Sequence, residues 1–209
     1  MSIYSLKPTF QTLLRPLVRV LARIGVTANM VTIFTAVISV LFGLYLCLTL
    51  NIHEIGAVAL LPIFLFIRMA LNAIDGMLAR EHNQQSTLGA YLNEVGDLIA
   101  DAALIGPFAL LAPFLPFWII IILLLSWLTE FIGMMGATIS ASRRYDGPMG
   151  KSDRAFLFGT LGLAAWAYDG LSPVLYWLQP LLALALIITC VKRLRGALQE
   201  ANEVSASAF

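Results

Sequence analysis

Long apolar runs occupy most of this chain and leave little sequence for a soluble domain. A helix needs about 20 consecutive apolar residues to cross the hydrocarbon core of a bilayer. Runs of this kind lie at residues 30–50, 56–71, 97 or earlier to 115, 117–139, 155–166 or a little beyond, and 173–191. With 60% hydrophobic and only 12% charged residues, the composition is not that of a soluble protein. The sequence predicts an all-α integral membrane protein with six transmembrane helices.

The basic residues support this count because they fall on alternate connections. Near residues 51–55, 112–116 and 169–172 there is no Lys or Arg, whereas twelve of the 13 basic residues lie on the other side of the predicted spans. These are Lys7, Arg15, Arg19, Arg23, Arg80, Arg143, Arg144, Lys151, Arg154, Lys192, Arg193 and Arg195. The positive-inside rule makes that side cytoplasmic. We therefore expect a multi-pass protein of the bacterial inner (cytoplasmic) membrane, with both termini inside.

The first 28 residues have the pattern of a helix that lies flat on the membrane. Apolar residues recur at helical spacing from Leu6 to Leu21, while Arg15, Arg19 and Arg23 repeat every four residues on another face. A basic flank that only sets the topology is an equally simple interpretation. The chain thus divides into an amphipathic juxtamembrane helix at 1–28, a six-helix membrane domain at 29–196, and a short cytoplasmic tail at 197–209.

Polar side chains at helical spacing interrupt two of the apolar runs. Asn72 and Asp75 lie three residues apart, and Asn93, Asp97 and Asp101 follow at intervals of four, so each set occupies one helical face. Carboxylates inside a span need a partner or a wet cavity, and oxygen ligands of this kind suit a divalent cation. The alternative is that these aspartates form ion pairs instead, Asp75 with Arg80 and Asp97 with Arg68.

These residues belong to a longer pattern that resembles the signature of the CDP-alcohol phosphatidyltransferase family, D-x-x-D-G-x-x-A-R, about eight residues, then G-x-x-x-D-x-x-x-D. Six of the eight fixed positions match, and they are Asp75, Gly76, Ala79, Arg80, Gly89 and Asp97. The segment at 26–32 also resembles the family's approach to its first span. The resemblance implies a transferase that moves a phosphatidyl or related substituted phosphoryl group from a CDP-linked donor such as CDP-diacylglycerol to an alcohol, with release of CMP.

The resemblance also implies roles for single residues. Asp97 matches the aspartate taken as the general base, and Asp75, with Asp97 and the positions of Asn72 and Asn93, matches the ligands of a divalent metal, Mg²⁺ or Mn²⁺. The positions that bind the donor are matched by Asp75, Gly76, Ala79, Arg80 and Gly89. Two of the family's four aspartates are replaced here by Asn72 and Asn93, which removes two negative charges and should weaken metal binding. Asp101 and Glu94 are candidates to compensate, although neither has the right position on its helix.

Basic residues further along the chain suggest where the acceptor binds. Arg143, Arg144, Lys151 and Arg154 cluster in one predicted cytoplasmic loop, which suits a phosphate-bearing acceptor or anionic headgroups. We include Arg68, the one basic residue within a span, among the expected acceptor contacts. Glu130 loosely matches a buried glutamate of phosphatidylglycerol-phosphate-synthase-like members of the family. The family is typically a homodimer, and Gly133, Gly136 and Ser140 are small enough to permit close helix contact.

Two other functions are compatible with the same residues. A pseudoenzyme would bind the CDP-lipid without turnover, which the asparagines at two metal positions favour. A small-solute transporter would also place acidic side chains in a six-helix bundle, but the chain lacks paired inverted halves. We expect the partners to be the lipid donor, the alcohol and the membrane, with no nucleic acid.

Overall fold

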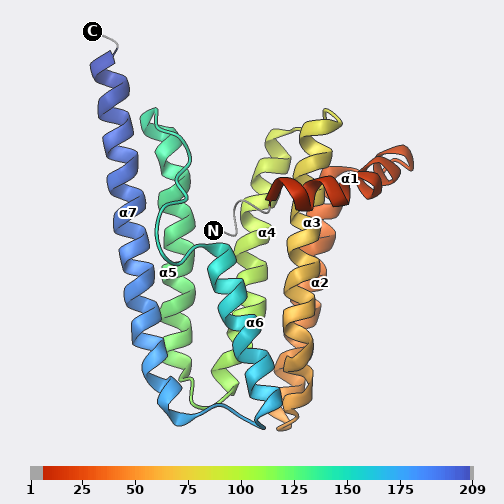
Figure 1. Ribbon diagram of the computed structural model, residues 1–209, viewed down its shortest axis with the longest axis vertical. Helices are drawn as coiled ribbons and strands as arrows, with labels where there is room; N and C mark the ends of the chain where they lie inside the picture. Colours follow the sequence, from red (N-terminus) through yellow and green to blue (C-terminus); the bar gives the residue numbers. More distant parts are fainter. Residues whose placement is uncertain (1–6, 208–209) are drawn as a thin grey trace. The chain divides into compact units, whose positions relative to one another are not determined.

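The computed structural model describes residues 7–207, and every element in that range is helical (Figure 1). The α-helices are α1 (Lys7–Arg23), α2 (Ala28–Asn51), α3 (Leu61–Glu81), α4 (Thr87–Ile105), α5 (Pro116–Met135), α6 (Lys151–Ala167) and α7 (Leu178–Ser207). Short 3₁₀ turns precede or follow several of them, at η2 (Ile55–Leu60), η3 (Gly106–Leu110), η4 (Gly136–Ile139) and η5 (Pro173–Trp177). The predicted all-α class is confirmed.

Within the described residues, four helical segments are long and apolar enough to cross a membrane: Ala28–Asn51, Ile55–Glu81, Pro116–Ile139 and Pro173–Ala206. They correspond to the first, second, fourth and sixth predicted spans. Of the other two, α6 has 17 residues and α4 has 19 with three acidic side chains among them. The count of six spans therefore stays a prediction.

The chain divides into two compact units. Unit 1 comprises Met1–Tyr45 and Ile63–Leu104, and unit 2 comprises Leu46–Pro62 and Ile105–Phe209. Unit 1 thus contains α1 with most of α2, α3 and α4, and unit 2 contains α5, α6 and α7.

Two glycines allow α2 and α4 to approach closely in unit 1. A Cβ atom at Gly43 would overlap the backbone of Ala103, and a Cβ at Gly96 would lie 3.5 Å from Ala36 Cβ. Since small residues let helix backbones come together, these positions fix how α4 lies along α2. The face of α4 that carries Asn93 and Asp97 is thereby turned toward α3.

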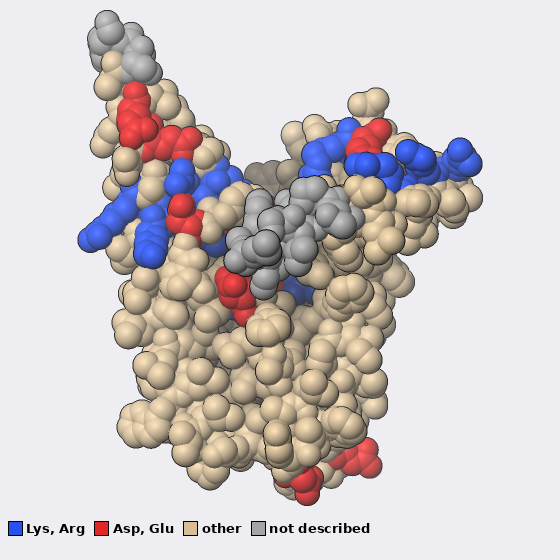
Figure 2. Space-filling model, in the orientation of Figure 1, with Lys and Arg blue, Asp and Glu red and all other residues tan. Residues whose placement is uncertain are grey.

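The N-terminal helix α1 lies crosswise to α2 and α3 (Figure 1). Its Val18 is fully buried in a cluster with Ile74, Met77 and Leu78 of α3. Arg15 pairs with Glu81 at 3.1 Å, so α1 is held at the end of the unit where α3 ends. Basic side chains of unit 1 gather there, while the visible flank of its long helices is uncharged (Figure 2). That α1 rests on a membrane surface stays a prediction.

In unit 2, α5 packs along α7, and α6 packs against η2. The loop after η4 folds back on α5, since the amides of Ala141 and Arg144 donate to the carbonyls of Gly136 and Gly133 at 3.0 Å each. A Cβ atom at Gly136 would lie 2.5 Å from the carbonyl oxygen of Ser142, and a Cβ atom at Gly133 would lie 2.7 Å from that of Arg144. Both glycines are buried and lie against the chain's own loop, which gives no support to a contact with a second copy at these two positions.

The ends of two helices can be compared with the sequence pattern. The helix α4 begins at Thr87, in agreement with a third run that starts at 97 or earlier, and Asp97 lies in its middle. At the other end of the chain α7 continues to Ser207, so the segment predicted as a tail is helical as far as the structure describes it.

Candidate functional site

The predicted motif lies on two neighbouring helices of unit 1 and the short connection between them. α3 carries its first half, α4 carries its second half, and residues 82–86 join the two. Ser86 begins α4 by accepting the Gly89 amide on its hydroxyl at 2.9 Å, which is ordinary N-cap chemistry. A hydrogen bond of 3.1 Å from the Asn72 side-chain amide to Asp97 Oδ1 shows that the two polar stripes face one another.

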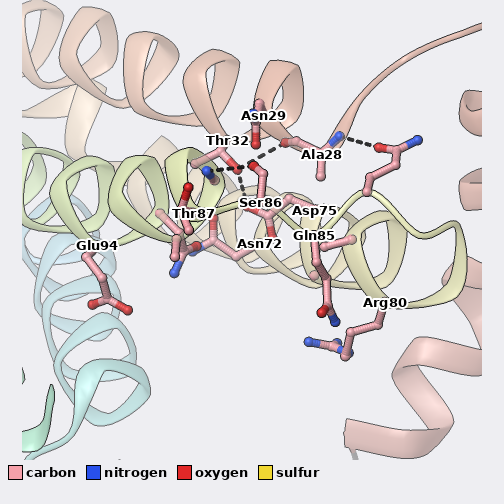
Figure 3. Close-up of a pocket in the computed structure, with 16 residues that line it drawn as sticks. Ala28, Asn29, Thr32, Asn72, Asp75, Arg80, Gln85, Ser86, Thr87 and Glu94 are labelled. Atoms are coloured by element: carbon pink, nitrogen blue, oxygen red, sulfur yellow. Dashed lines mark hydrogen bonds between the residues drawn. The ribbon is translucent and has the colours of Figure 1, made fainter. Parts of the chain in front are cut away.

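A cavity of about 700 Å³ opens beside these stripes, within unit 1. In Figure 3, Thr32, Asn72 and Asp75 lie near its centre, with Glu94 to one side and Arg80 to the other. Its lining residues come from the first turns of α2, from α3, from the connection and from α4, and they are Ala28, Asn29, Thr32, Asn72, Asp75, Gly76, Ala79, Arg80, Gln84, Gln85, Ser86, Thr87, Gly89, Ala90, Asn93 and Glu94.

The two motif glycines make room for polar side chains at the cavity wall. A Cβ at Gly76 would lie 3.2 Å from both terminal nitrogens of Arg80, so the guanidinium folds back over this glycine. A Cβ at Gly89 would lie 2.6 Å from Asn29 Oδ1. The cavity therefore has one cationic end, at Arg80, and amide groups contributed by the start of α2 and the connection.

Asp75 is the motif carboxylate that lies in the cavity wall. It is buried, at 6% exposure, and its Oδ2 accepts a hydrogen bond of 2.8 Å from the Thr32 hydroxyl of α2. The Ala28 amide at the start of α2 donates to Gln84 Oε1 at 2.7 Å, which ties α2 to the connection after α3. These contacts hold the carboxylate beside the first turns of α2.

Asp97 is held by α3. Its Oδ1 accepts from Asn72 and also pairs with Arg68 Nη2 at 3.2 Å, while Arg68 Nη1 pairs with Asp101 Oδ1 at 2.9 Å. All three charged side chains are largely buried. The ion pair predicted as an alternative for Asp97 is therefore present. Arg68 faces two carboxylates and does not line the cavity, which gives no support to its predicted contact with the acceptor.

The donor chemistry of this site fits a hard cation. Asn72, Asp75 and Asn93, whose side chains all carry oxygen atoms, line the cavity, and Asn72 donates a hydrogen bond to Asp97. Carboxylate and amide oxygens are what Mg²⁺ and Mn²⁺ prefer. Among the residues described here, no three His, Cys, Asp or Glu side chains converge as a metal cluster. The four predicted metal ligands therefore carry few negative charges, because two of them are asparagines.

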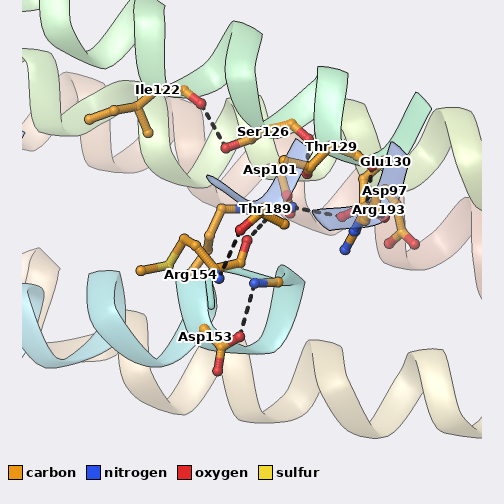
Figure 4. A network of polar contacts seen from close by, with 12 residues as sticks. Asp97, Asp101, Ile122, Ser126, Thr129, Glu130, Asp153, Arg154, Thr189 and Arg193 are labelled. Carbon is orange, nitrogen blue, oxygen red and sulfur yellow. Dashed lines mark hydrogen bonds and ion pairs between the residues drawn. The ribbon is translucent and has the colours of Figure 1, made fainter. Parts of the chain in front are cut away.

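Unit 2 contains a separate cluster of arginines around one carboxylate. Glu130 of α5 pairs with Arg154 at 3.3 Å, with Arg193 at 3.4 Å and with Arg143 at 3.7 Å. Figure 4 shows Arg154 of α6 and Arg193 of α7 beside Glu130. Both arginines are almost fully buried, whereas Arg143 is one-third exposed. Three arginines thus surround one carboxylate, and guanidinium groups are suited to binding phosphate and other anions.

The other two predicted acceptor residues have different surroundings. Arg144 pairs with Asp146 at 2.7 Å and with Glu200 of α7 at 2.7 Å. The Arg144 guanidinium, through its hydrogen bonds, holds the pKa of Asp146 below the usual range, so this loop contact is ionised at neutral pH. Arg144 thus fastens the loop to α7. Lys151 is the first residue of α6 and is half-buried.

The chain matches one protein family over most of its length. Residues 25–191 match the CDP-alcohol phosphatidyltransferase family. The chain belongs to this family. Inner membrane protein YnbA of Escherichia coli (strain K12) is 45% identical over 204 residues, which are 98% of this chain and all of that protein.

Solved structures of one enzyme resemble the fold. Phosphatidylinositol phosphate synthase (PgsA1) of Mycobacterium tuberculosis with CDP-DAG bound gives a TM-score of 0.70 at 25% identity, covering 87% of this chain and 92% of that one. The same synthase with manganese and citrate gives 0.70 at 26% identity, covering 87% of each chain. As a member of the family with this likeness, the chain is a CDP-alcohol phosphatidyltransferase-like transferase.

The CDP-alcohol phosphatidyltransferase motif accounts for only part of the cavity. Seven of its eight positions line it, and the eighth, Asp97, lies behind Asn72. The motif does not include Asn29, Thr32, Gln84 or Gln85, which also line the wall. Asn29 and Thr32 lie in the segment at 26–32, which resembles the family's approach to its first span. That resemblance could have identified them as site residues from the sequence. Arg193 was counted only as a topology-setting charge, and its contact with Glu130 had no signal in the sequence.

Proposed function

We propose that this transferase moves a phosphatidyl group from a CDP-linked lipid, such as CDP-diacylglycerol, to an alcohol and releases CMP. The observation that carries the proposal is the cavity of unit 1, whose wall is built from the family's motif residues. Its volume of about 700 Å³ is in the range of small-molecule sites. The related synthase was solved with CDP-DAG bound, which supports the choice of donor.

In this proposal the donor's diphosphate binds at Arg80, whose guanidinium lies over Gly76. Gly76, Ala79 and Gly89 keep the wall free of bulky side chains, so that the nucleotide approaches the helix backbones. Asn29 and Gln85 supply amide groups with both donors and acceptors. Those groups have the chemistry needed to recognise a base edge.

Asn72, Asp75, Asn93 and Asp97 would hold a divalent cation, Mg²⁺ or Mn²⁺. When bound, such an ion neutralises the diphosphate and eases departure of CMP. Asp97 takes the proton of the acceptor hydroxyl as general base. The hydroxyl oxygen attacks the phosphorus that carries the lipid, and the bond from that phosphorus to the CMP oxygen breaks. Asn72 and Arg68 orient the carboxylate for this step.

For the acceptor we propose an alcohol that carries a phosphate. The three arginines around Glu130, of which Arg143 is partly exposed, favour an anionic group over a neutral alcohol. Arg154 and Arg193 are the buried members of this cluster, and Lys151 lies at the start of the same helix as Arg154. Arg144 keeps the loop in place in this scheme.

We further propose six membrane spans, with α4 and α6 completing the four apolar helices, and an amphipathic α1 at the membrane surface. Both termini and the active site face the cytoplasm in this scheme, and the name of the Escherichia coli relative supports the inner membrane. A homodimer is expected for the family, with a contact surface other than Gly133 and Gly136.

The competing function is a pseudoenzyme that binds CDP-lipid without turnover. Asn72 and Asn93 favour it, since they lower the charge of the metal site. Asp97→Ala separates the two functions, because it removes the base and leaves the cavity wall intact. We expect this variant to lose CMP release by at least about 100-fold while it binds CDP-diacylglycerol as the parent does.

The assay measures CMP from purified protein with CDP-diacylglycerol, Mn²⁺ and a set of phosphorylated and unphosphorylated alcohols, and it measures donor binding in parallel. Glu203→Gln, on the exposed last turns of α7, is a matched control that removes one carboxylate elsewhere. Full activity in Asp97→Ala would remove this residue from the role of base. Donor binding by the parent chain without CMP from any acceptor would favour the pseudoenzyme.

A further inference from the structure

The loop between η4 and α6, residues 140–150, carries Arg143 to the arginine cluster of unit 2. The Arg143 side chain is one-third exposed, and its Nη2 lies 3.7 Å from Glu130 Oε2. Its guanidinium carbon lies 5.3 Å from the centre of the Tyr145 ring, within the same loop. The place of this guanidinium therefore depends on the course of the loop on either side of residue 143.

Both sequence neighbours of Arg143 are bound by one carboxylate of α7, that of Glu200. Its Oε1 accepts from the Ser142 amide at 2.9 Å, and its Oε2 accepts from the Ser142 hydroxyl at 2.8 Å and from Arg144 Nη1 at 2.7 Å. An isolated exposed ion pair would contribute little. Here both carboxylate oxygens are engaged, and short hydrogen bonds to a charged acceptor are strong. Glu200 therefore restrains the chain on each side of residue 143.

The face of α7 that precedes Glu200 also fits the loop. Gly196 lies one turn earlier, and a Cβ atom there would meet Arg144 Nη2 at 2.8 Å, so the guanidinium rests on this glycine. Arg193, a further turn back, donates from Nε to the carbonyl oxygen of Asp146 at 3.3 Å. Asp146 Oδ2 in turn accepts from Arg144 Nε at 2.7 Å. Because positions three and four residues apart share a helical face, one face of α7 makes all of these contacts.

The contacts of Gly196 and Glu200 lie in a part of α7 that a membrane span does not need. α7 has 30 residues, whereas about 20 are enough to cross the hydrocarbon core. The apolar run of the sequence ends at residue 191, so both positions lie beyond it. The last turns of α7 therefore support the loop and are not required for crossing the membrane.

We propose that Glu200 is a positioning residue for the acceptor, because it holds the loop in the shape that presents Arg143 to the phosphate of the alcohol. The inference rests on the proposed function, since it concerns the acceptor of the same reaction. Glu200 acts through Ser142 and Arg144 and does not touch the acceptor. Its loss should therefore weaken binding of the acceptor and leave binding of the CDP-linked donor unchanged.

Binding of inorganic phosphate to the purified protein, measured by calorimetry, tests this role without turnover. Glu200→Ala should weaken phosphate binding on the order of tenfold, the effect of losing one well-placed hydrogen bond to a charged group. CDP-diacylglycerol should bind to this variant as it does to the parent chain. Glu203→Ala is the matched control, because Glu203 is an exposed carboxylate of the same helix that accepts from Gln199 of α7 itself. It should bind phosphate as the parent does.

Gly196→Ala tests the same contact without removing a charge or a hydrogen-bonding group. The added methyl group would displace the Arg144 guanidinium, which reaches Glu200 from this position. Alanine is a better helix former than glycine, so α7 should keep its stability. We expect weaker phosphate binding in this variant as well, and it carries the test if thermal unfolding shows that Glu200→Ala does not fold.

Two further readouts separate a positioning role from general damage. Hydrogen exchange of residues 140–150, followed by mass spectrometry, should be faster in Glu200→Ala than in Glu203→Ala, because the Ser142 amide has lost its acceptor. In the CMP assay, the KM for phosphorylated alcohols should rise in Glu200→Ala. The KM for CDP-diacylglycerol and the kcat at saturating acceptor should stay near those of the parent, whereas damage to the whole fold would change all three.

Two results would overturn the inference. One is phosphate binding at the parent's affinity in both Glu200→Ala and Gly196→Ala, and the other is an equal loss of phosphate and donor binding in these variants. In either case CMP release by the parent chain would leave the proposed function standing. A parent that binds phosphate but releases no CMP would contradict the proposed function alone. A parent that binds no phosphate would contradict the role of Glu200, while CMP formed with an unphosphorylated alcohol would still support phosphatidyl transfer.

Discussion

At the scale of single residues, the amide of Asn72 does something that a carboxylate cannot do. Its NH₂ group donates to Asp97 Oδ1 at 3.1 Å, whereas an aspartate at this position would be a second acceptor and would repel Asp97. Asn93 shares the cavity wall and adds a neutral oxygen. Asn72 therefore lowers the negative charge of the proposed metal site but supplies a hydrogen bond that orients the proposed base.

Restoring the charges gives a prediction about the metal. Asn72→Asp with Asn93→Asp should tighten Mn²⁺ binding by at least about tenfold, because two negative charges are added near the cation. Asn93→Asp alone is the matched comparison, since it adds one charge and keeps the hydrogen bond from Asn72. The metal concentration for half-maximal CMP release and direct Mn²⁺ binding both report the change. An unchanged metal dependence in the double variant would show that these positions are not ligands.

The sequence identified the motif residues but could not identify their partners. Helical spacing was enough to place Asn72 with Asp75 and Asn93 with Asp97. Whether Asp97 meets Arg68 or a metal depends on the rotation of α3 against α4, which hydropathy does not report. Arg68 could therefore be recognised as a residue that needs a partner, and Asp97 was only one of its candidate partners. Asp101 was noted for a possible metal role, and its pairing with Arg68 was not expected.

At the scale of helices, the packing of α2 against α4 decides which face of α4 reaches the cavity. Gly43 is the critical contact, because a Cβ there would overlap the backbone of Ala103. Backbone atoms cannot move aside as the end of a flexible side chain can. The sequence predicted the extent of α2 closely, but nothing in it indicated that Gly43 is a packing position.

Gly43→Ala should therefore destabilise the protein by about 1–3 kcal/mol, the usual cost of overpacking. Gly56→Ala is the control, because a Cβ at that glycine of η2 meets nothing within 4 Å. Thermal unfolding of both variants in the same detergent measures the difference. Equal stability of the two variants would mean that α2 and α4 do not approach as closely as described.

The start of α4 shows why the apolar pattern left one helix boundary open. An apolar window begins where polar residues become sparse, which is near Asp97. The helix itself begins at Thr87, because Ser86 caps it and the polar stretch from Asn93 to Asp101 still has helical spacing. In long apolar helices such as α2 and α5 the apolar run and the helix begin and end at nearly the same residues, so their bounds were predicted well.

At the scale of the whole molecule, the distribution of Lys and Arg along the chain predicts the orientation of the spans in the membrane. The connections at the ends of α2 and α6 that contain His53 and Asp169 have no Lys or Arg, whereas the opposite connections hold almost all of them. A net charge of +1 conceals this asymmetry. The positive-inside rule uses the distribution and ignores the total.

Cysteine labelling tests this topology. With Cys47 and Cys190 replaced by serine, Tyr168→Cys should react with a membrane-impermeant maleimide added to spheroplasts, since this residue is exposed at the end of α6. Asn202→Cys, exposed near the end of α7, should react only after the membrane is opened. The reverse order of labelling would place the basic connections outside and contradict the cytoplasmic site.

The central claim is that the chain transfers a phosphatidyl group and does not merely bind its donor. The most direct measurement follows CMP and the new lipid together, with purified protein, CDP-diacylglycerol, Mn²⁺ and phosphorylated alcohols. We predict that CMP and one acceptor-containing lipid form in equal amounts, and that a chelator stops both. Donor binding without CMP would contradict this account, and so would CMP released in the absence of any acceptor with no new lipid formed.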